Sequence, residues 1–394
     1  MTSGAAFDRA RSPDETWALI APELAGFGIT RLARLTGLDR IGVPVWSAIA
    51  PNARSIAVNQ GKGLTDGQAR ISAAMEAIER ALAAQPERPV VTGPAEGFAP
   101  TDQRFDLLPE LIAGGQLPLT VDEPVEWLVG EDLIRGDAIM LPADALRLDR
   151  TRADLRFWQS SDGLAAGNTV DEARLSAILE RVERDAETLW YLRSPARRMD
   201  TRFDPAHFGD RVLDDLLERI GNASLTAAFF DMTSDVGIPC ILCFVGPQSI
   251  DTRKGFSMVD VTAGSCADPS PVRAAIQAAL EAVQSRMTYI SGARDDIDPA
   301  IFTKPLPELT RLLMLAPTRA FPEFPKVDAS GRSMLQTIIT RLEVVGCNRV
   351  YAVSLASAGR FFAVEKLVAP ELENPEGQRR QPFGRRAIRQ ALMP

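Results

Sequence analysis

The chain has 394 residues, of which 45% are hydrophobic and 24% are charged, and its formal net charge is −8. This composition excludes a disordered or collagen-like chain, and the acidic balance argues against a long nucleic-acid-binding surface. The sequence has neither a long apolar run nor an apolar N-terminal region, so neither a membrane span nor a secretory signal is expected. Four cysteines are too few for a disulfide framework in a chain of this length, so we expect a cytoplasmic protein.

Short apolar segments and longer segments of helical period follow one another along the chain. We predict strands at 44–49, 125–130, 137–141, 225–231, 238–245, 256–262, 349–356 and 361–368. Strands and helices mix without strict alternation, which predicts an α+β fold. The stretch 88–122 is rich in Pro and Gly, and we interpret it as an irregular insert because the motifs on its two sides have to meet. One large domain is therefore favoured over two.

Three segments predict helices that share one pattern and recur about every hundred residues. They are ISAAMEAIER at 71–80, LSAILERVER at 175–184 and IQAALEAVQS at 276–285. Apolar residues recur with a period of about 3.6 residues in each. Thr65 with Gln68 and Thr169 with Glu172 are candidate capping boxes before the first two helices, and Pro271 suits the first turn of the third.

Each predicted helix carries a second stripe, made of acids or amides three residues apart, beside its apolar stripe. The pairs are Glu76 and Glu79, Glu180 and Glu183, and Glu281 and Gln284. A single E-x-x-E pair is explained by a solvated face, because glutamate is a good helix former. Three copies in one register at the edge of the core-facing side are not. Since Mg²⁺ prefers oxygen ligands, the acidic pairs predict a magnesium site.

The segments that precede the three helices are rich in glycine. They span 59–65, 160–169 and 262–268, and the first contains Lys62. Glycine lets backbone amides approach a phosphate, and the N-terminus of a helix favours an anion. A Walker A motif is absent from the sequence. Together with the paired acids, these segments predict a nucleotide polyphosphate held through Mg²⁺.

The sequence also limits the chemistry of the site. His207 is the single histidine, so a triad would depend on one residue in a turn-like segment. Cys240 and Cys243 lie in the apolar run IPCILCFVG, which predicts core thiols rather than zinc ligands. Arginines cluster near the C-terminus, and we interpret them as a solvated basic tail: Arg379, Arg380, Arg385, Arg386 and Arg389.

Three long motifs resemble the signatures of the YcaO family. These motifs are GKGLTDGQARISAAMEAIER, SDGLAAGNTVDEARLSAILERVERD and ALEAVQSRMTYISGARDD. They stand in the family's order between positions 61 and 296, and the resemblance extends to VEKLVAPELEN at 364–374. It implies a YcaO domain at 57–394, with an N-terminal segment at 1–56 packed on it.

The resemblance implies ATP-dependent activation of peptide backbone amides, with ATP and Mg²⁺ as cofactors. In that family the amide oxygen attacks the γ-phosphate of ATP, a nucleophile adds to the amide carbon, and phosphate leaves. A neighbouring Cys, Ser or Thr side chain gives an azoline, whereas external sulfide gives a thioamide. Such phosphoryl transfer depends on positioning and charge neutralisation more than on a covalent nucleophile, so a site without histidine suffices.

By resemblance, each acidic or cationic motif residue receives a role. The Mg²⁺ ligands would be Glu76, Glu79, Glu180 and Glu183. The nucleotide would be bound by Lys62, Ser72, Asn168, Glu172, Arg184 and Gln284, and Glu281 and Arg286 would be catalytic. Two of these residues have a structural alternative, since Glu172 would also serve as a helix cap and Ser72 would also serve in packing.

The sequence departs from the family pattern at two places. Ala267 stands where many members have His, and the C-terminal QPFGRRAIRQALMP lacks the Pro-x-Pro-x-Pro ending of azoline-forming members. An additional N-terminal domain for leader-peptide capture is not seen either. Residues 28–52 resemble the subgroup found with a separate TfuA-type partner and associated with thioamide formation.

We therefore place thioamide formation ahead of azoline formation. A non-catalytic scaffold that binds ATP or a peptide, and an unrelated Mg²⁺-ATP ligase acting on a small metabolite, are the rival classes. The expected partners are a peptide or protein substrate and a TfuA-like protein, with a homodimer left open and neither nucleic acid nor membrane expected.

Overall fold

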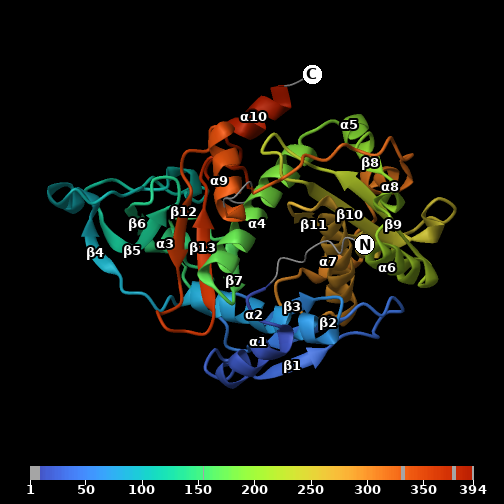
Figure 1. Ribbon diagram of the computed structural model, residues 1–394, viewed down its shortest axis with the longest axis horizontal. Coiled ribbons are helices and arrows are strands. Elements are labelled where there is room, and N and C mark those ends of the chain that lie inside the picture. Colours follow the sequence, from blue (N-terminus) through green and yellow to red (C-terminus); the bar gives the residue numbers. More distant parts are fainter. Residues whose placement is uncertain (1–8, 154, 330–332, 375–378, 393–394) are drawn as a thin grey trace.

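The computed structural model in Figure 1 describes residues 9–153, 155–329, 333–374 and 379–392, which form three antiparallel sheets with helices between them. The first sheet contains β1 (Arg31–Arg34), β2 (Val45–Ile49) and β3 (Val58–Lys62). The second has the order β4 (Val91–Pro94), β5 (Pro124–Asp132), β12 (Tyr351–Ser354), β13 (Ala363–Val368) and β7 (Leu164–Gly167), and β6 (Ala138–Pro142) also pairs with β5. The third has the order β11 (Thr262–Ala267), β10 (Cys240–Pro247), β9 (Leu225–Asp231) and β8 (Arg202–Phe203).

Helices lie between and around these sheets, so the predicted α+β class is confirmed. They are α1 (Pro13–Ile20), α2 (Asp66–Ala84), α3 (Ala143–Leu146), α4 (Val170–Tyr191), α5 (Pro195–Met199), α6 (Arg211–Asn222), α7 (Pro271–Ser291), α8 (Glu308–Leu315), α9 (Met334–Val344) and α10 (Arg385–Leu392). Within the part of the chain that is described, no helix has the length and apolar character needed to cross a bilayer. The predicted N-terminal segment contributes β1 and β2, which pair onward to β3; its division from the rest at residue 56 stays a prediction.

The three glycine-rich segments each contain a strand that leads into one of the predicted helices. They form the units β3–α2, β7–α4 and β11–α7. The capping box of Thr65 and Gln68 is confirmed, and Pro271 stands at the first turn of α7. The second box is only half formed. Thr169 accepts the N–H of Glu172, but the Glu172 carboxylate accepts the N–H of Asn168 instead of returning to Thr169.

Close packing of helix on strand explains two of the glycines in these units. A Cβ on Gly61 would lie 2.0 Å from the backbone nitrogen of Ala73, and one on Gly264 would lie 2.3 Å from that of Ala282. No side chain fits at such distances, so the backbone of each helix rests directly on its strand. The glycine pattern that we attributed to phosphate binding therefore has a packing origin at these positions.

The predicted strands agree with the structure where apolar residues run without interruption. The strand predicted at 225–231 is β9, whereas the strand predicted at 256–262 is wrong. Met258–Asp260 form a 3-10 turn, because the carboxylate of Asp260 accepts the N–H and hydroxyl of Ser257. The third sheet resumes at Thr262, and in the 88–122 insert only β4 and short 3-10 turns are regular.

The core contains large apolar side chains from the second and third sheets and from α4. Trp127, Trp190 and Phe229 are fully buried, each in a different apolar cluster. Cys240 and Cys243 lie on β10, buried and without a disulfide, so the prediction that they are core thiols is confirmed. Burial raises the pKa of both thiols, which keeps them protonated.

The prediction of a solvated basic C-terminal tail is wrong for two of its arginines. Arg386 donates two hydrogen bonds of 2.8 Å to the fully buried carboxylate of Asp185 on α4. Arg379 is also buried. Glu373 accepts the N–H groups of Gly384 and Ala387 at 2.8 Å each, which caps the start of α10. The described C-terminal residues therefore pack along α4, because the buried Asp185 needs a cationic partner.

Candidate functional site

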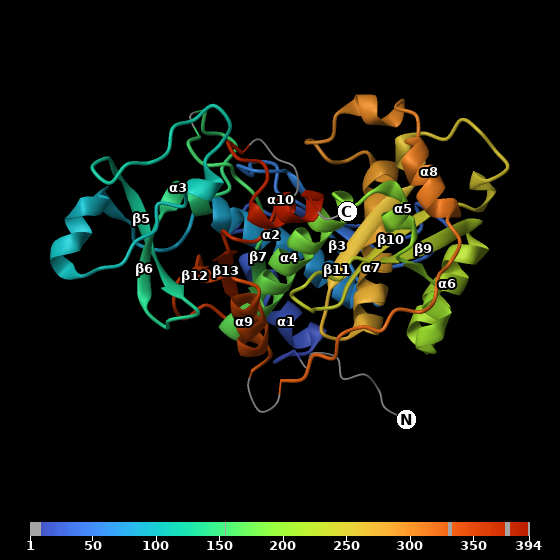
Figure 2. The same ribbon diagram turned by 90° about the horizontal axis from the view of Figure 1, so that it is seen from above.

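The three strand–helix units contact one another in a cycle. Helix α2 packs against β7 of the second unit, α4 packs against β11 of the third, and α7 packs against β3 of the first. Figures 1 and 2 show the three helices meeting in the middle of the molecule. The structure therefore brings together the acid and amide stripes that the sequence places about a hundred residues apart.

The second member of each stripe reaches the strand of the next unit. The backbone N–H of Ala166 on β7 donates to Glu79 at 2.6 Å, and the hydroxyl of Ser265 on β11 donates to Glu183 at 2.7 Å. Gln284 completes the cycle by donating to the backbone carbonyl of Gln60 on β3 at 3.1 Å. These equivalent contacts fix the three stripes relative to one another, and they explain why the register repeats in the sequence.

The first member of each stripe lies against a strand or loop backbone, or against a cation. Glu76 accepts the N–H of Gln60 at 3.3 Å, and Glu180 accepts the N–H of Gly163 at 3.0 Å. Glu281 of the third helix pairs with Lys62 at 3.1 Å. Lys62 therefore lies between the first and third units, where the sequence predicted a cation.

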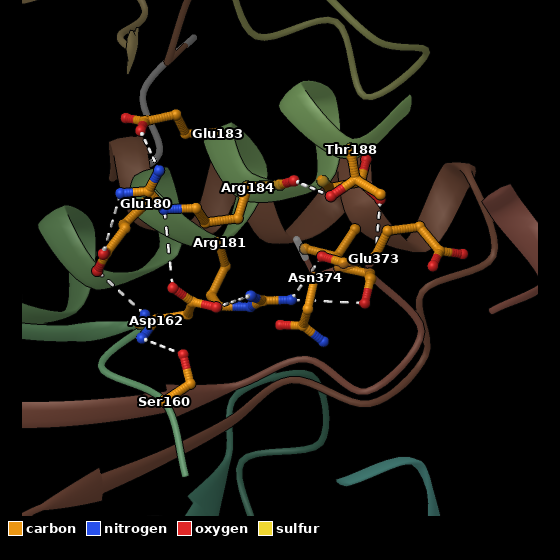
Figure 3. Close-up of polar contacts among 12 residues, drawn as sticks. Ser160, Asp162, Glu180, Arg181, Glu183, Arg184, Thr188, Glu373 and Asn374 are labelled. Carbon is orange, nitrogen blue, oxygen red and sulfur yellow. Dashed lines mark hydrogen bonds and ion pairs between the residues drawn. The ribbon is translucent and has the colours of Figure 1, made fainter. Parts of the chain in front are cut away.

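Arg184 is the cation at the centre of the acidic stripe on α4 (Figure 3). Its guanidinium lies 3.1 Å from Glu187, 3.5 Å from Glu183 and 3.9 Å from Glu180, and its Nε lies 3.7 Å from Asp162. Asp162 and Glu187 were not among the site residues predicted from the sequence. Asp162 stands within the S-x-G part of the second motif, which is the signal that would have identified it.

Burial and mutual repulsion raise the pKa values of three acids in the stripes. Burial, reinforced by the charge of Glu76, raises the pKa of Glu79 to about 8. Burial likewise raises the pKa values of Glu180 and Glu183 to about 7, although Arg184 opposes both shifts. Burial opposes charge on Lys62, but the ion pair and hydrogen bond with Glu281, together with nearby groups that include Glu183, raise the pKa of that amine. Without a bound cation, the stripes thus hold more negative charge than they can accommodate at neutral pH.

These shifts predict that the free protein loses stability as the pH rises from about 5 to about 8.5. The folded state binds more protons than the unfolded state across this range, so each shifted acid lowers the free energy of unfolding by up to about 1.4 kcal/mol per pH unit. Differential scanning fluorimetry should show a falling Tm. Glu79→Gln should flatten the slope, and Mg²⁺-ATP should flatten it in the wild type. A Tm that rises over this range would contradict the shifts.

The stripes fit Mg²⁺ bound jointly with phosphates rather than a closed protein cage. Within the described residues, no three Asp, Glu, His or Cys side chains come together as a metal site. Glu79, Glu180 and Glu183 each use one oxygen in a hydrogen bond, which leaves the second oxygen for a metal. Mg²⁺ is commonly held by one or two carboxylates, water and substrate phosphates, so this dispersed arrangement suits it.

The remaining predicted residues lie in three further places. Asn168 and Glu172 contact the N-terminal segment, where Thr16 donates to Asn168 at 2.8 Å and the N–H of Ala10 donates to Glu172 at 2.5 Å. No sequence pattern pointed to these contacts. Ser72 is half-buried on α2. Arg286, five residues after Glu281, lies on another side of α7 and forms its ion pair with Asp39 at 4.0 Å, so the structure does not bring it to the stripe.

The fold and the three linked stripes define an α+β protein with a buried acidic site that requires cations. The chain belongs to the YcaO family: the family model described as "YcaO cyclodehydratase, ATP- and Mg²⁺-binding" matches residues 60–373. The predicted cofactors, ATP and Mg²⁺, are thereby confirmed for its family, as is the broad class of a YcaO-type ATP-dependent enzyme. The roles of the individual site residues stay predictions.

Three known proteins illustrate the similarity. An uncharacterized protein of Rhizobium leguminosarum bv. trifolii, described as lying in the tfuA 3′ region, is 40% identical over 299 residues, which is 75% of this chain and 71% of that protein. A heterocyclase solved with substrate and cofactor has a TM-score of 0.74 at 20% identity; the match covers 96% of this chain but 54% of the heterocyclase. YcaO from Methanopyrus kandleri, solved with AMPPCP and Mg²⁺, has a TM-score of 0.67 at 22% identity. The match covers 93% of this chain and 92% of the Methanopyrus chain. The two structural similarities show the fold.

Proposed function

We propose that this chain uses Mg²⁺-ATP to activate a backbone amide of a peptide and that sulfur then replaces the amide oxygen, giving a thioamide. The similarity to the protein in the tfuA 3′ region carries this assignment, because it points to a TfuA-like partner. In the proposed reaction ATP and hydrosulfide are consumed, ADP and phosphate are released, and the amide oxygen leaves within the phosphate.

In this reaction the acids of the stripes bind the metal, and the neighbouring cations bind the phosphates. Mg²⁺-ATP, when bound, supplies the phosphoryl group that turns the amide oxygen into a leaving group. The metal is held by the acids of the first two helices: Glu76, Glu79, Glu180 and Glu183. Lys62 and Arg184 provide fixed positive charge for the phosphate oxygens, and both are already oriented by carboxylate partners. The buried setting strengthens these interactions, because water screens them less.

Azoline formation is the second candidate, and the similarity to the heterocyclase favours it. The nucleophile would then be a Cys, Ser or Thr side chain of the peptide instead of sulfide. The same residues would activate the amide, and the net change would be the loss of one water for each ring. The two reactions therefore share the site and differ in the nucleophile that reaches it.

Mass spectrometry of the peptide product distinguishes these reactions. With ATP, Mg²⁺, a TfuA-like partner and a sulfide source, we expect an oxygen of the substrate peptide to be replaced by sulfur. Omitting ATP, or using Glu180→Gln, should leave the peptide unchanged. Loss of water would contradict thioamide formation and retain amide activation. If the protein binds Mg²⁺-ATP but leaves the peptide unmodified with every partner tested, the result would favour a non-catalytic scaffold that binds ATP or a peptide.

A further inference from the structure

A small cavity lies beside the acidic stripes and is lined by two cationic side chains. Its volume is about 30 Å³, and it is bounded by the loop of Trp158, Ser160 and Asp162, by Arg181 on α4 and by Lys366 on β13. The apolar part of its wall comes from Leu111, Ala145, Leu367, Val368 and Ala369. A space of this size holds one or two waters or one small ion.

Both cations are buried and keep hydrogen-bonding capacity. Arg181 is 3% exposed; its Nη2 donates to the carbonyls of Leu372 and Glu373, but its Nη1 is buried without a hydrogen-bond partner. Lys366 is 5% exposed, and its ammonium donates to the carbonyls of Ser160 and Asp162, which accounts for two of its three N–H groups. A buried guanidinium nitrogen without an acceptor is costly, so this lining calls for an acceptor in the cavity.

Among the side chains that line the cavity, the cations outnumber the carboxylates by one, and Glu180 lies outside the lining but near both cations. Asp162 is the single carboxylate among the residues that line the cavity, and it lies 3.8 Å from Nη1 of Arg181. It therefore balances one of the two cations. Asn374 also lines the cavity. The charge of the lining, the small volume and the unpartnered Nη1 donor all favour a small anion as the occupant.

We propose that this cavity binds one small monovalent anion, held by Nη1 of Arg181 and the ammonium of Lys366. Halide and hydrosulfide ions share this charge and compact size. Asp162 connects the cavity to the acidic site, because it also lies 3.7 Å from Arg184, and the adjoining Gly163 donates to Glu180. If the anion is hydrosulfide, an inference that depends on the proposed function, the cavity holds the sulfur nucleophile one loop away from the acidic stripes.

Bromide is a suitable probe because its anomalous scattering locates it in a crystal. Crystals of the wild-type protein soaked in bromide, without ATP or peptide, should show an anomalous peak between Arg181 and Lys366. The peak should persist in Arg181→Lys, which keeps the charge, and disappear in Arg181→Met. Lys366→Met should weaken it, and Arg211→Met, at an exposed position on α6, should leave it unchanged. A wild-type cavity that contains only water would overturn the proposal.

Competition identifies the source of the anion. Sodium sulfide added to the bromide soak should remove the peak if hydrosulfide is the natural occupant, whereas a peak that persists supports a structural halide. In solution, the line width of the ³⁵Cl NMR signal should increase with wild-type protein and respond to sulfide in the same way. These measurements need no catalysis, so an empty cavity and a failure of thioamide formation are separate results.

Discussion

Glu76→Gln and Glu180→Gln should each weaken the binding of Mg²⁺-ATP by about 100-fold or more. Each substitution keeps the shape of the side chain but removes one negative charge that the metal requires, and even residues that only orient a metal ligand commonly contribute 10- to 100-fold. The two glutamates lie on different helices, and each accepts a backbone N–H, from Gln60 and Gly163 respectively. Equal losses from both would mean that the two helices share one nucleotide.

Isothermal titration calorimetry with Mg²⁺ and a non-hydrolysable ATP analogue measures this loss directly. Glu218→Gln on α6 is the matched control, because Glu218 is an exposed glutamate on a helix that carries no stripe. Circular dichroism should show that all three variants remain folded. Unchanged affinity in Glu76→Gln and Glu180→Gln would remove the stripes from the nucleotide site and leave the family assignment intact.

Arg184→Met should lower the free energy of unfolding of the free protein by about 3–5 kcal/mol at pH 8, the range typical for removing one partner from a buried ionic group. The guanidinium contacts four carboxylates, on Asp162, Glu180, Glu183 and Glu187, and its loss leaves them to repel one another. The effect should shrink near pH 5.5. Burial raises the pKa values of Glu180 and Glu183 to about 7, so both acids are then protonated.

Urea denaturation at the two pH values tests this pattern. Arg211→Met is the matched control, since Arg211 is exposed on α6, and it should change stability little at either pH. A loss of similar size at pH 8 and pH 5.5 would indicate that Arg184 acts through packing of its side chain. The charge compensation described for the acidic stripe on α4 would then be wrong.

The sequence predicted the three stripe-bearing helices α2, α4 and α7, because a helix displays its contacts with a fixed period. The spacing of Glu76 with Glu79 recurs in Glu180 with Glu183 and in Glu281 with Gln284, and this repetition predicted three equivalent helix faces. The strands β3 and β7 were missed because they are short and contain glycine, which is depleted in strands and typical of loops. Their glycines serve contacts with helices that only the folded chain reveals.

The partners of charged residues were less predictable than the residues themselves. Arg386 and Asp185 are 201 positions apart, and nothing local distinguishes an arginine that folds back onto a buried acid from one that stays in solvent. Lys366 gave no signal for the same reason, although it stands in a segment that resembles the family, whereas Asp162 was overlooked inside the second motif. Burial of a charge is a property of the whole fold, so it is read from sequence only when a motif is already known.

The cyclic arrangement of the three units also has a consequence for the order in which the protein matures. The contact that closes the cycle joins Gln284 to Gln60 across 224 positions of sequence, and contacts of such separation form late in folding. A chain still emerging from the ribosome carries the first two acid stripes long before α7 exists. Lys62 then lacks Glu281, and β3 lacks the helix that completes the cycle. If the stripes bind ATP as proposed, a partly synthesised chain therefore lacks a complete nucleotide site.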